Sequence, residues 1–334
     1  MISTIISIFS YLKWYIRPVV KWFLRKTTRL CELQRICYGE EFGFRRSSKI
    51  ETSLSLSRTK DILQMVQQLN NLSMQGRFVD KAMKNCVEYA VKLTIDVKDI
   101  KPTFHMRFIN NYKICLYQIY GYKQLLHEVE VLRKTPYSSE NKEHEDKLLK
   151  LWSLLNPDKP LQNRISKQWT DIGFQGDDPK TDFRGMGVLG LENLLYFATE
   201  HSETARHVLL HSNHPTYGYS FAIVGINLTS MAYDLLRNKT LQVHFYNSVK
   251  GKPKMNDFHY VYCYLFYEFD KFWLSEKPRD IMEFSRIRAK FQDNVLKLLQ
   301  NPKAQLKTVD YIALSVNQLV DNIDHLLMEK ENEL

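Results

Sequence analysis

A single arginine stands among glycine, aspartate and proline residues in the stretch 169–191, which reads WTDIGFQGDDPKTDFRGMGVLGL. This composition is unusual, because the whole chain of 334 residues contains only 12 glycines and 10 prolines. The guanidinium of Arg184 offers a planar fork of donors that keeps its charge, so it suits phosphoryl oxygens on a partner. Alternatively, Arg184 ties the loop down by pairing with Asp177, Asp178 or Asp182. The composition of the loop leaves both interpretations open.

The neighbours of Arg184 indicate how a loop could present it. Gly185 and Gly187 remove side chains beside the arginine and allow another backbone to come close. Phe183 and Met186 are apolar, and we expect them to anchor the loop from below. Asp182 is expected to fix the conformation of the loop, since short acidic side chains favour turns and helix caps.

The run GMGVLG at 185–190 matches the pattern GxGxxG of dinucleotide-binding proteins. That site needs a buried strand before the glycines and a helix after them. The preceding run, DDPKTD at 177–182, is too polar for a buried parallel strand. We therefore predict that the chain binds no dinucleotide cofactor.

Two groups of side chains have the chemistry of metal ligands. The carboxylates of Asp177, Asp178 and Asp182 suit a hard cation, but their spacing matches no calcium loop, and turn formation is the simpler role. His207 and His211 are four residues apart and could share a helix face, yet no third ligand follows at zinc spacing. The five cysteines form no CxxC pair, which favours a reducing compartment. We predict no metal site.

Apolar residues recur at helical spacing along most of the chain, which predicts an all-α fold that holds the loop between helices. A break at 136–141 divides these helices into two regions, and residues 31–57 are interpreted as a polar, irregular connector. The expected helices cover 60–72, 81–93, 108–133, 144–155, 162–169, 188–197, 219–236, 258–274, 281–299 and 309–327.

The first 30 residues carry a separate pattern. Residues 2–12 are uncharged, and Lys13, Arg17, Lys21 and Arg25 then recur at every fourth position among aromatic and aliphatic residues. On a helix this spacing is typical of a segment that lies at a membrane surface. The uncharged run has about half of the roughly 20 residues that a transmembrane helix needs. A mitochondrial or other targeting segment and a helix packed on the domain are the alternatives.

Much of the formal charge of +10 belongs to this N-terminal segment. Further along the chain, lysine and arginine alternate with aspartate and glutamate, as on an ordinary solvated surface. A nucleic-acid-binding protein needs a basic face on its folded domain. We therefore expect no nucleic-acid partner.

The loop residues also form part of a long motif. Trp169, the run IGFQG at 172–176, Asp178, Pro179 and the run TDFRGMG at 181–187 resemble the signature of the ELMO domain, as do GYSFAIVGIN at 218–227 and EFDKFW at 268–273. The run CELQRI at 31–36 is similar to the start of short proteins with a single ELMO domain. The resemblance implies a multi-helix ELMO domain at 143–299. A basic-aromatic helix at 1–30, the connector and a helical region at 58–142 precede it, and a tail follows at 300–334.

For function, the resemblance implies a GTPase-activating protein for Arf and Arf-like small GTPases in their GTP form. The family's required arginine corresponds to Arg184, and the motif residues around it are intact. The supporting loop residues are Gln175, Asp178, Asp182, Phe183, Gly185 and Gly187, among which Gln175 is a candidate for orienting water. GTP and Mg belong to the partner GTPase, so the chain needs no cofactor and turns over no substrate of its own.

A second function class stays open, because larger ELMO proteins work as scaffolds beside exchange factors. An ELMO-type adaptor could bind a GTPase, or its exchange factor, without stimulating hydrolysis. In either case, the N-terminal segment predicts a cytoplasmic protein that is peripheral on an intracellular membrane, including an association with mitochondria.

Overall fold

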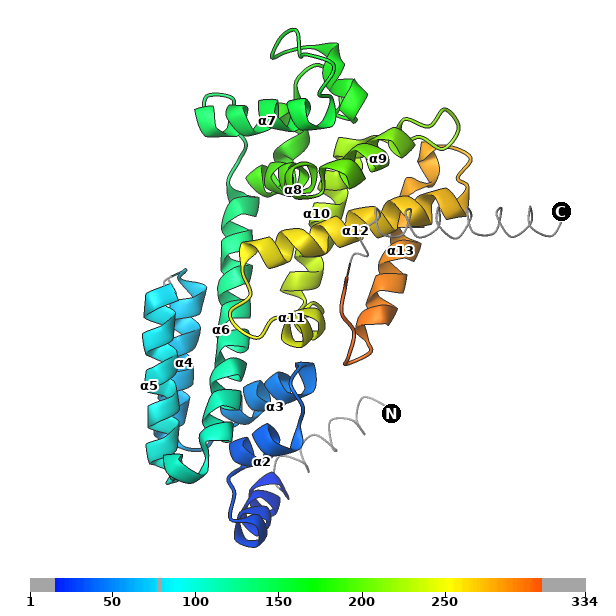
Figure 1. Cartoon of the computed structure of the whole chain (residues 1–334). Helices are drawn as coiled ribbons and strands as arrows, with labels where there is room; N and C mark the ends of the chain where they lie inside the picture. Colours follow the sequence, from blue (N-terminus) through cyan, green and yellow to red (C-terminus); the bar gives the residue numbers. More distant parts are fainter. Residues whose placement is uncertain (1–15, 77–79, 308–334) are drawn as a thin grey trace, which may run out of the picture. The chain divides into compact units, whose positions relative to one another are not determined.

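The computed structural model describes residues 16–76 and 80–307 of the chain. Within these residues every regular element is a helix, and no strand is present (Figure 1). The predicted all-α fold is confirmed. The expected helix at 309–327 and the uncharged run at 2–12 lie outside the described residues.

The chain forms two compact units, of which the first contains the described residues up to His127 together with Gln242–Pro253 and Asn301–Ala304. In this unit α4 and α5 pack against each other, and α3 contacts α2, α4 and α11. Its elements are α2 (Glu32–Gly39), α3 (Phe44–Ser55), α4 (Lys60–Met74), α5 (Asp80–Lys98), η1 (Pro102–Phe104), most of α6 (Met106–Lys134) and α11 (Gln242–Ser248).

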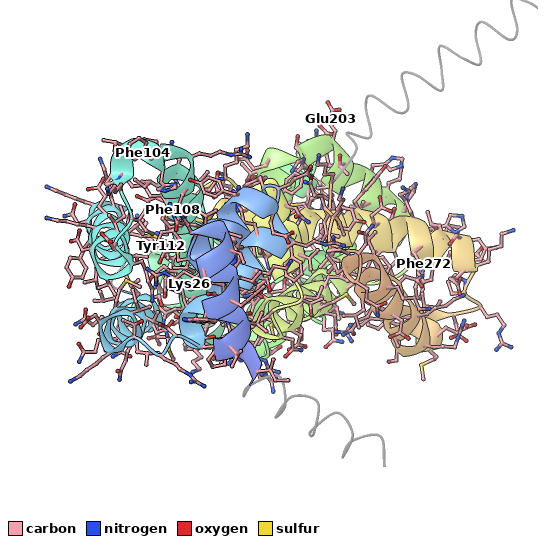
Figure 2. All side chains as sticks on the ribbon, turned by 90° about the horizontal axis from the view of Figure 1, so that it is seen from below. Lys26, Phe104, Phe108, Tyr112, Glu203 and Phe272 are labelled. Carbon is pink, nitrogen blue, oxygen red and sulfur yellow. The ribbon has the colours of Figure 1, made fainter. Side chains whose placement is uncertain are left out.

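The core of the first unit is built on α6. Phe108 and Tyr112 are fully buried and stack with their ring centroids 5.4 Å apart. They lie one helical turn apart, so both face the same neighbours. Figure 2 shows the two rings inside the unit and Phe104 at its edge, where that side chain is 79% exposed.

Residues 31–57 are not an irregular connector, so this prediction is wrong: they form α2 and α3. The sequence of these helices shows no clear apolar pattern because several of their buried residues are polar, among them Ser47. The hydroxyl of Ser47 donates to Gln118 Oε1, and Gln118 Nε2 donates in turn to the carbonyl of Tyr246 over 3.0 Å. Buried polar groups are stable where they find such partners.

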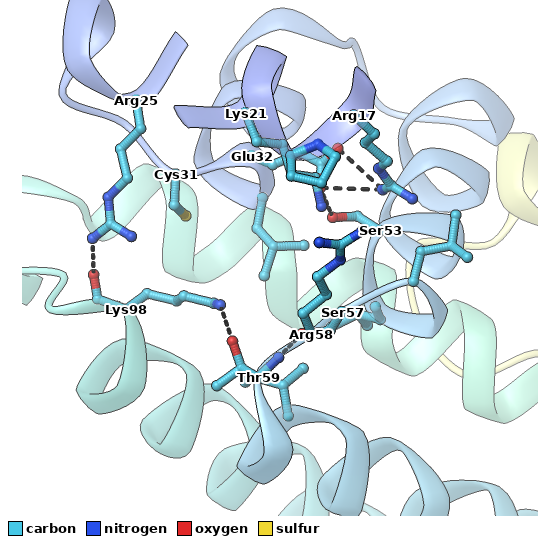
Figure 3. Close-up of a pocket in the computed structure, with 15 residues that line it drawn as sticks. Arg17, Lys21, Arg25, Cys31, Glu32, Ser53, Ser57, Arg58, Thr59 and Lys98 are labelled. Carbon is cyan, nitrogen blue, oxygen red and sulfur yellow. Dashed lines mark hydrogen bonds and ion pairs between the residues drawn. The ribbon is translucent and has the colours of Figure 1, made fainter. Parts of the chain in front are cut away.

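Residues 16–28 are helical, and Arg17, Lys21 and Arg25 point toward the rest of the first unit (Figure 3). Arg17 and Lys21 pair with Glu32, at 3.1 and 2.5 Å. The opposite side of this helix is open and mostly apolar, since Val19, Trp22 and Phe23 are 65%, 63% and 57% exposed. The cation Lys26 is exposed on the same side. The helix is amphipathic as predicted, with its apolar side facing outward.

None of the helices in the described ranges has both the length and the apolar character needed to cross a membrane.

The second unit contains residues 128–241, 254–300 and the described residues 305–307, and it includes the loop of Arg184. Helix α8 is its centre and packs against α7, α9, α10 and α12 (Figure 1). The prediction of a helix at 162–169 is wrong, because only a short 3₁₀ helix begins within this range. The sequence does not predict α9. The elements are α7 (Lys142–Leu155), η2 (Lys167–Ile172), η3 (Pro179–Arg184), α8 (Gly187–Glu200), α9 (Ser202–Ser212), α10 (Phe221–Arg237), α12 (Met255–Glu276), η4 (Ile281–Glu283) and α13 (Phe284–Leu299).

Candidate functional site

The loop between α7 and α8 contains two short 3₁₀ helices, η2 and η3. Each begins with a side chain that caps it: Ser166 Oγ accepts from the backbone N–H of Gln168, and Asp178 Oδ1 accepts from that of Lys180 over 3.0 Å. Pro179 occupies the first helical position of η3, where no N–H is needed. The capping role that the sequence predicts for the aspartates is confirmed at Asp178.

A chain of aromatic rings anchors the loop in the second unit. Trp169 is fully buried, and Phe174 packs edge-on against it at a centroid distance of 5.8 Å. Phe183 continues the chain, 5.6 Å from Phe174 and 5.0 Å from Tyr137. The predicted anchoring role of Phe183 is confirmed. Such ring pairs add to the stability gained from apolar burial, so they hold the residues around Arg184 on a rigid base.

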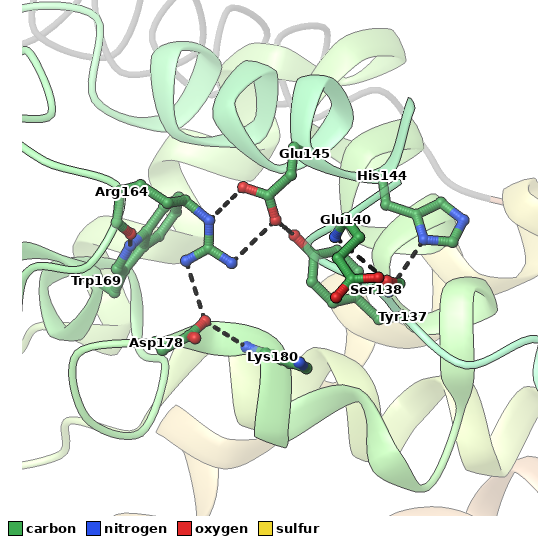
Figure 4. Close-up of polar contacts among 9 residues, drawn as sticks. All are labelled: Tyr137, Ser138, Glu140, His144, Glu145, Arg164, Trp169, Asp178 and Lys180. Atoms are coloured by element: carbon green, nitrogen blue, oxygen red, sulfur yellow. Dashed lines mark hydrogen bonds and ion pairs between the residues drawn. The ribbon is translucent and has the colours of Figure 1, made fainter. Parts of the chain in front are cut away.

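An ion-pair network crosses the loop beside this aromatic chain (Figure 4). Arg164 donates from Nη1 to Asp178 Oδ1 over 3.0 Å and from Nη2 to Glu145 Oε1 over 3.0 Å. The hydroxyl of Tyr137 donates to the same Glu145 oxygen. Sequence reasoning missed Arg164, because nothing in its neighbourhood in the chain indicates its distant partner on α7.

A second carboxylate fixes the middle of the loop. Asp182 Oδ2 accepts a hydrogen bond of 2.8 Å from the backbone N–H of Gln175. Burial raises the pKa of Asp182, while this hydrogen bond and the nearby charge of Arg184 act in the opposite direction. The predicted role of Asp182 in fixing the loop is confirmed. Gln175 itself is exposed.

Arg184 occupies the last position of η3 and is exposed. Its Nε donates to the carbonyl of Thr181 over 3.2 Å. In the described part of the chain no carboxylate forms an ion pair with its guanidinium, whereas Asp178 pairs with Arg164 and Asp182 accepts from the backbone of Gln175. The alternative in which the loop aspartates tie Arg184 down is therefore wrong.

The two glycines beside Arg184 have different roles. A Cβ at Gly185 would meet nothing within 4 Å, so this side of the arginine is open. Gly187 is buried with φ +54°, and a Cβ there would lie 2.3 Å from the carbonyl oxygen of Thr135. The predicted role of Gly187 in admitting a partner is wrong, because its missing side chain lets α8 begin against the end of α6.

The structure also locates the alternative sites that the sequence suggests. The chain enters Gly185 from the 3₁₀ helix η3, so within the described residues no strand precedes the GxGxxG match. His211 Nδ1 pairs with buried Asp270 Oδ2 at 2.7 Å, and the hydroxyl of Tyr219 donates to the other oxygen of Asp270 over 2.7 Å. Among the residues described, no group of histidine, cysteine and acidic side chains has the arrangement of a metal site.

The comparison with known proteins agrees with the motif. A sequence profile of the ELMO/CED-12 family matches residues 127–288, which include the whole loop. The chain is 52% identical to ELMO domain-containing protein 2 from Bos taurus over 285 residues, which are 85% of this chain and 92% of that protein. The chain belongs to the ELMO/CED-12 family. The ELMO resemblance found in the sequence is thereby confirmed.

Other members of the ELMO family are also similar along most of their length. The chain is 45% identical to ELMO domain-containing protein 1 from Mus musculus over 318 residues, which cover 90% of this chain and 93% of that protein. It is 35% identical to ELMO domain-containing protein B from Dictyostelium discoideum over 281 residues, 83% and 93% of the two chains. Membership in this family supports a role linked to small GTPases.

Proposed function

We propose that this ELMO protein is a GTPase-activating protein for Arf or Arf-like small GTPases, and that Arg184 enters the nucleotide site of the GTP-bound partner. The position of Arg184 carries the proposal. The residue ends an anchored 3₁₀ helix, its side chain is exposed, and its guanidinium pairs with no carboxylate of the described residues. An arginine in this position can reach an anion on another protein.

The chemistry of GTP hydrolysis explains why an arginine is needed. Negative charge spreads over the oxygens of the γ-phosphoryl group in the transition state, and an arginine supplied by a partner protein stabilises it. In other GTPase systems such an arginine raises the rate by about 10³- to 10⁵-fold. GTP and Mg remain with the GTPase, which also positions the attacking water. The ELMO protein is then an activator without a cofactor.

The residues around Arg184 support this role by position. Asp178 begins η3 and Phe183 anchors its other end, so the backbone that carries the arginine is held on both sides. Gly185 leaves open space next to Arg184. Preorganised charge costs little reorganisation when the transition state forms, which is the benefit of such a rigid loop. Gln175, exposed and hydrogen-bonded to Asp182 through its backbone, is a candidate for orienting water.

We also propose that the protein is peripheral on the cytoplasmic side of an intracellular membrane, the mitochondrial surface included. The apolar side of helix 16–28 supports this, because Val19, Trp22 and Phe23 are exposed next to one another on one helix. Aromatic and aliphatic side chains on one face of a short helix favour the boundary between headgroups and acyl chains. Arf-family GTPases would be met at that surface.

One panel separates the activator from a scaffold. The full chain is mixed with several Arf and Arf-like GTPases loaded with GTP, and both complex formation and phosphate release are measured without membranes. Faster hydrolysis by at least one GTPase supports the proposal. Binding to the GTP form with no faster hydrolysis contradicts it and assigns the chain to the adaptor class.

A further inference from the structure

The first unit contains a pocket of about 270 Å³ between helix 16–28, α2, the segment after α3 and the end of α5 (Figure 3). Its volume is near the lower limit for small-molecule sites. Five basic side chains line it, from three parts of the sequence, together with one carboxylate. They are Arg17, Lys21, Arg25, Arg58 and Lys98, with Glu32 as the acidic residue.

The single carboxylate is already occupied. Glu32 Oε1 accepts from Arg17 Nη2 over 3.1 Å, and Glu32 Oε2 accepts from Ser53 Oγ over 2.5 Å and lies 2.5 Å from Lys21 Nζ. These contacts lower the pKa of Glu32, although burial acts against its charged form. Five positive charges and one negative charge leave the lining with four positive charges in excess.

Two of the remaining cations, Arg25 and Lys98, donate to neutral acceptors. Arg25 Nη2 donates to the carbonyl of Lys98 over 3.2 Å. Lys98 Nζ donates to Thr59 Oγ1 over 2.8 Å. Burial lowers the pKa of Lys98, and the charges of Arg25 and Lys21 lower it further. Within the described residues neither Arg25 nor Lys98 forms an ion pair with a carboxylate, so positive charge accumulates at this pocket and an anion would relieve the repulsion.

We infer that this pocket binds a phosphate monoester, carried by the headgroup of a phosphorylated inositol lipid. Guanidinium forks and ammonium groups around one small cavity suit the several oxygens and the double charge of a phosphate ester. An ordinary carboxylate would neutralise only one of the four excess charges. The site is separate from Arg184, which belongs to the second unit.

The helix that forms one wall of the pocket indicates that the phosphate ester belongs to a lipid. Arg17, Lys21 and Arg25 line the pocket, while Trp22 and Phe23 of the same helix are exposed. The helix can therefore place apolar side chains in a membrane while its basic side chains hold a headgroup. This part of the inference rests on the membrane association proposed above. Binding of a soluble phosphate ester to the pocket does not depend on it.

The first arm of the test uses soluble inositol trisphosphate and the full chain in a calorimetric titration. We expect saturable binding at one site. Arg58→Glu reverses a charge on an exposed lining residue and should weaken this binding by at least about tenfold, since one charge-assisted hydrogen bond is lost and a repulsion is added. Lys84→Glu makes the same charge reversal at an exposed site on α5 outside the pocket and should change it less than about twofold. No saturable binding, or equal weakening by both variants, overturns the inference.

A second variant and a second arm complete the test. Lys98→Met should also weaken binding, and its melting temperature without ligand shows whether the fold is intact. Co-sedimentation then compares vesicles that contain phosphatidylinositol bisphosphate with phosphatidylserine vesicles of equal surface charge. Preference for the former, lost in Arg58→Glu, supports the lipid source. Equal binding to both, together with binding of inositol trisphosphate, overturns the lipid source and identifies a soluble phosphate ester as the ligand. If the protein does not activate a GTPase in the assay without membranes, the results of the titration and of the co-sedimentation still stand.

Discussion

Arg164 Nη1 lies 3.0 Å from Asp178 Oδ1, and this ion pair separates the roles of two arginines in one loop. Arg164 is part of the structure that holds η3, because it joins the cap of that helix to Glu145 on α7. Arg184 ends the same 3₁₀ helix, and within the described residues its side chain donates to a neutral carbonyl. The acidic residues of the loop therefore stabilise the loop and leave Arg184 available to a partner.

The contrast between Arg164 and Arg184 predicts different effects of their substitution on stability. Arg164→Met should lower the free energy of unfolding by about 2 kcal/mol, because Glu145 and Asp178 lose a charged donor in a half-buried position. Arg184→Ala should change it by less than about 0.5 kcal/mol, as expected for an exposed side chain. Urea unfolding of both variants measures the difference. Equal destabilisation by the two substitutions contradicts the separation of roles.

The glycines next to Arg184 provide a matched pair. Gly187→Ala should destabilise the protein by at least about 2 kcal/mol, because alanine is strained at φ +54° and its Cβ would lie 2.3 Å from the Thr135 carbonyl oxygen. Gly185→Ala should have little effect on stability, since its Cβ meets open space. Thermal and urea unfolding check both. A mild effect at Gly187 would show that α8 can begin without this close approach to α6.

The sequence predicts the long helices because they are rich in apolar residues over more than ten positions. It does not predict α2 and α3, where buried Arg46 and Ser47 break the apolar pattern. It also misses α9, a short helix with few apolar residues. A single sequence gives helical periodicity directly, whereas a buried polar helix is recognised only when its partners from other elements are known.

In the loop, too, a single sequence does not reveal the contacts between residues that are distant in the chain. The motif identifies Arg184 and its neighbours, and the packing of Phe183 agrees with its apolar character. The sequence does not reveal that Asp178 prefers Arg164, which stands fourteen residues earlier, or that Gly187 faces the carbonyl groups at the end of α6. Both facts depend on how the chain returns on itself, and local spacing carries no signal for that.

The His211–Asp270 pair predicts a pH dependence of stability. The hydrogen bond to Asp270 raises the pKa of His211 above its usual value of about 6.5. The pair therefore stabilises the fold fully below that value and loses its effect as the pH rises through the raised pKa. The melting temperature of wild type minus that of His211→Gln should shrink as the pH rises from acid to mildly alkaline.

The neighbouring histidine is the control for this pH series. Burial and the charge of His211 lower the pKa of His207, whose ring centroid is 4.1 Å from that of His211. A histidine with a lowered pKa destabilises the fold as the pH falls through its unfolded value. His207→Gln should therefore shift the profile in the opposite direction. The same pH profile for wild type and His211→Gln would contradict the assignment.

The exposed apolar side of helix 16–28 predicts a membrane contact that can be removed without loss of fold. Trp22→Ser should leave the melting temperature nearly unchanged, because the side chain is 63% exposed, and should reduce co-sedimentation with anionic vesicles severalfold. Phe104→Ser removes an aromatic ring that is 79% exposed elsewhere in the same unit and serves as the control. Equal vesicle binding by wild type and Trp22→Ser contradicts membrane association through this helix.

The most direct test of the proposed GTPase activation is single-turnover hydrolysis of GTP by an Arf-family GTPase with excess ELMO protein. Wild type should accelerate hydrolysis, and Arg184→Ala and Arg184→Lys should each lose about 10³-fold or more of that acceleration, since lysine keeps the charge but lacks the planar fork. Lys180→Ala, which removes an exposed cation from the same 3₁₀ helix, should retain it. Near-wild-type acceleration by both Arg184 variants would contradict the account.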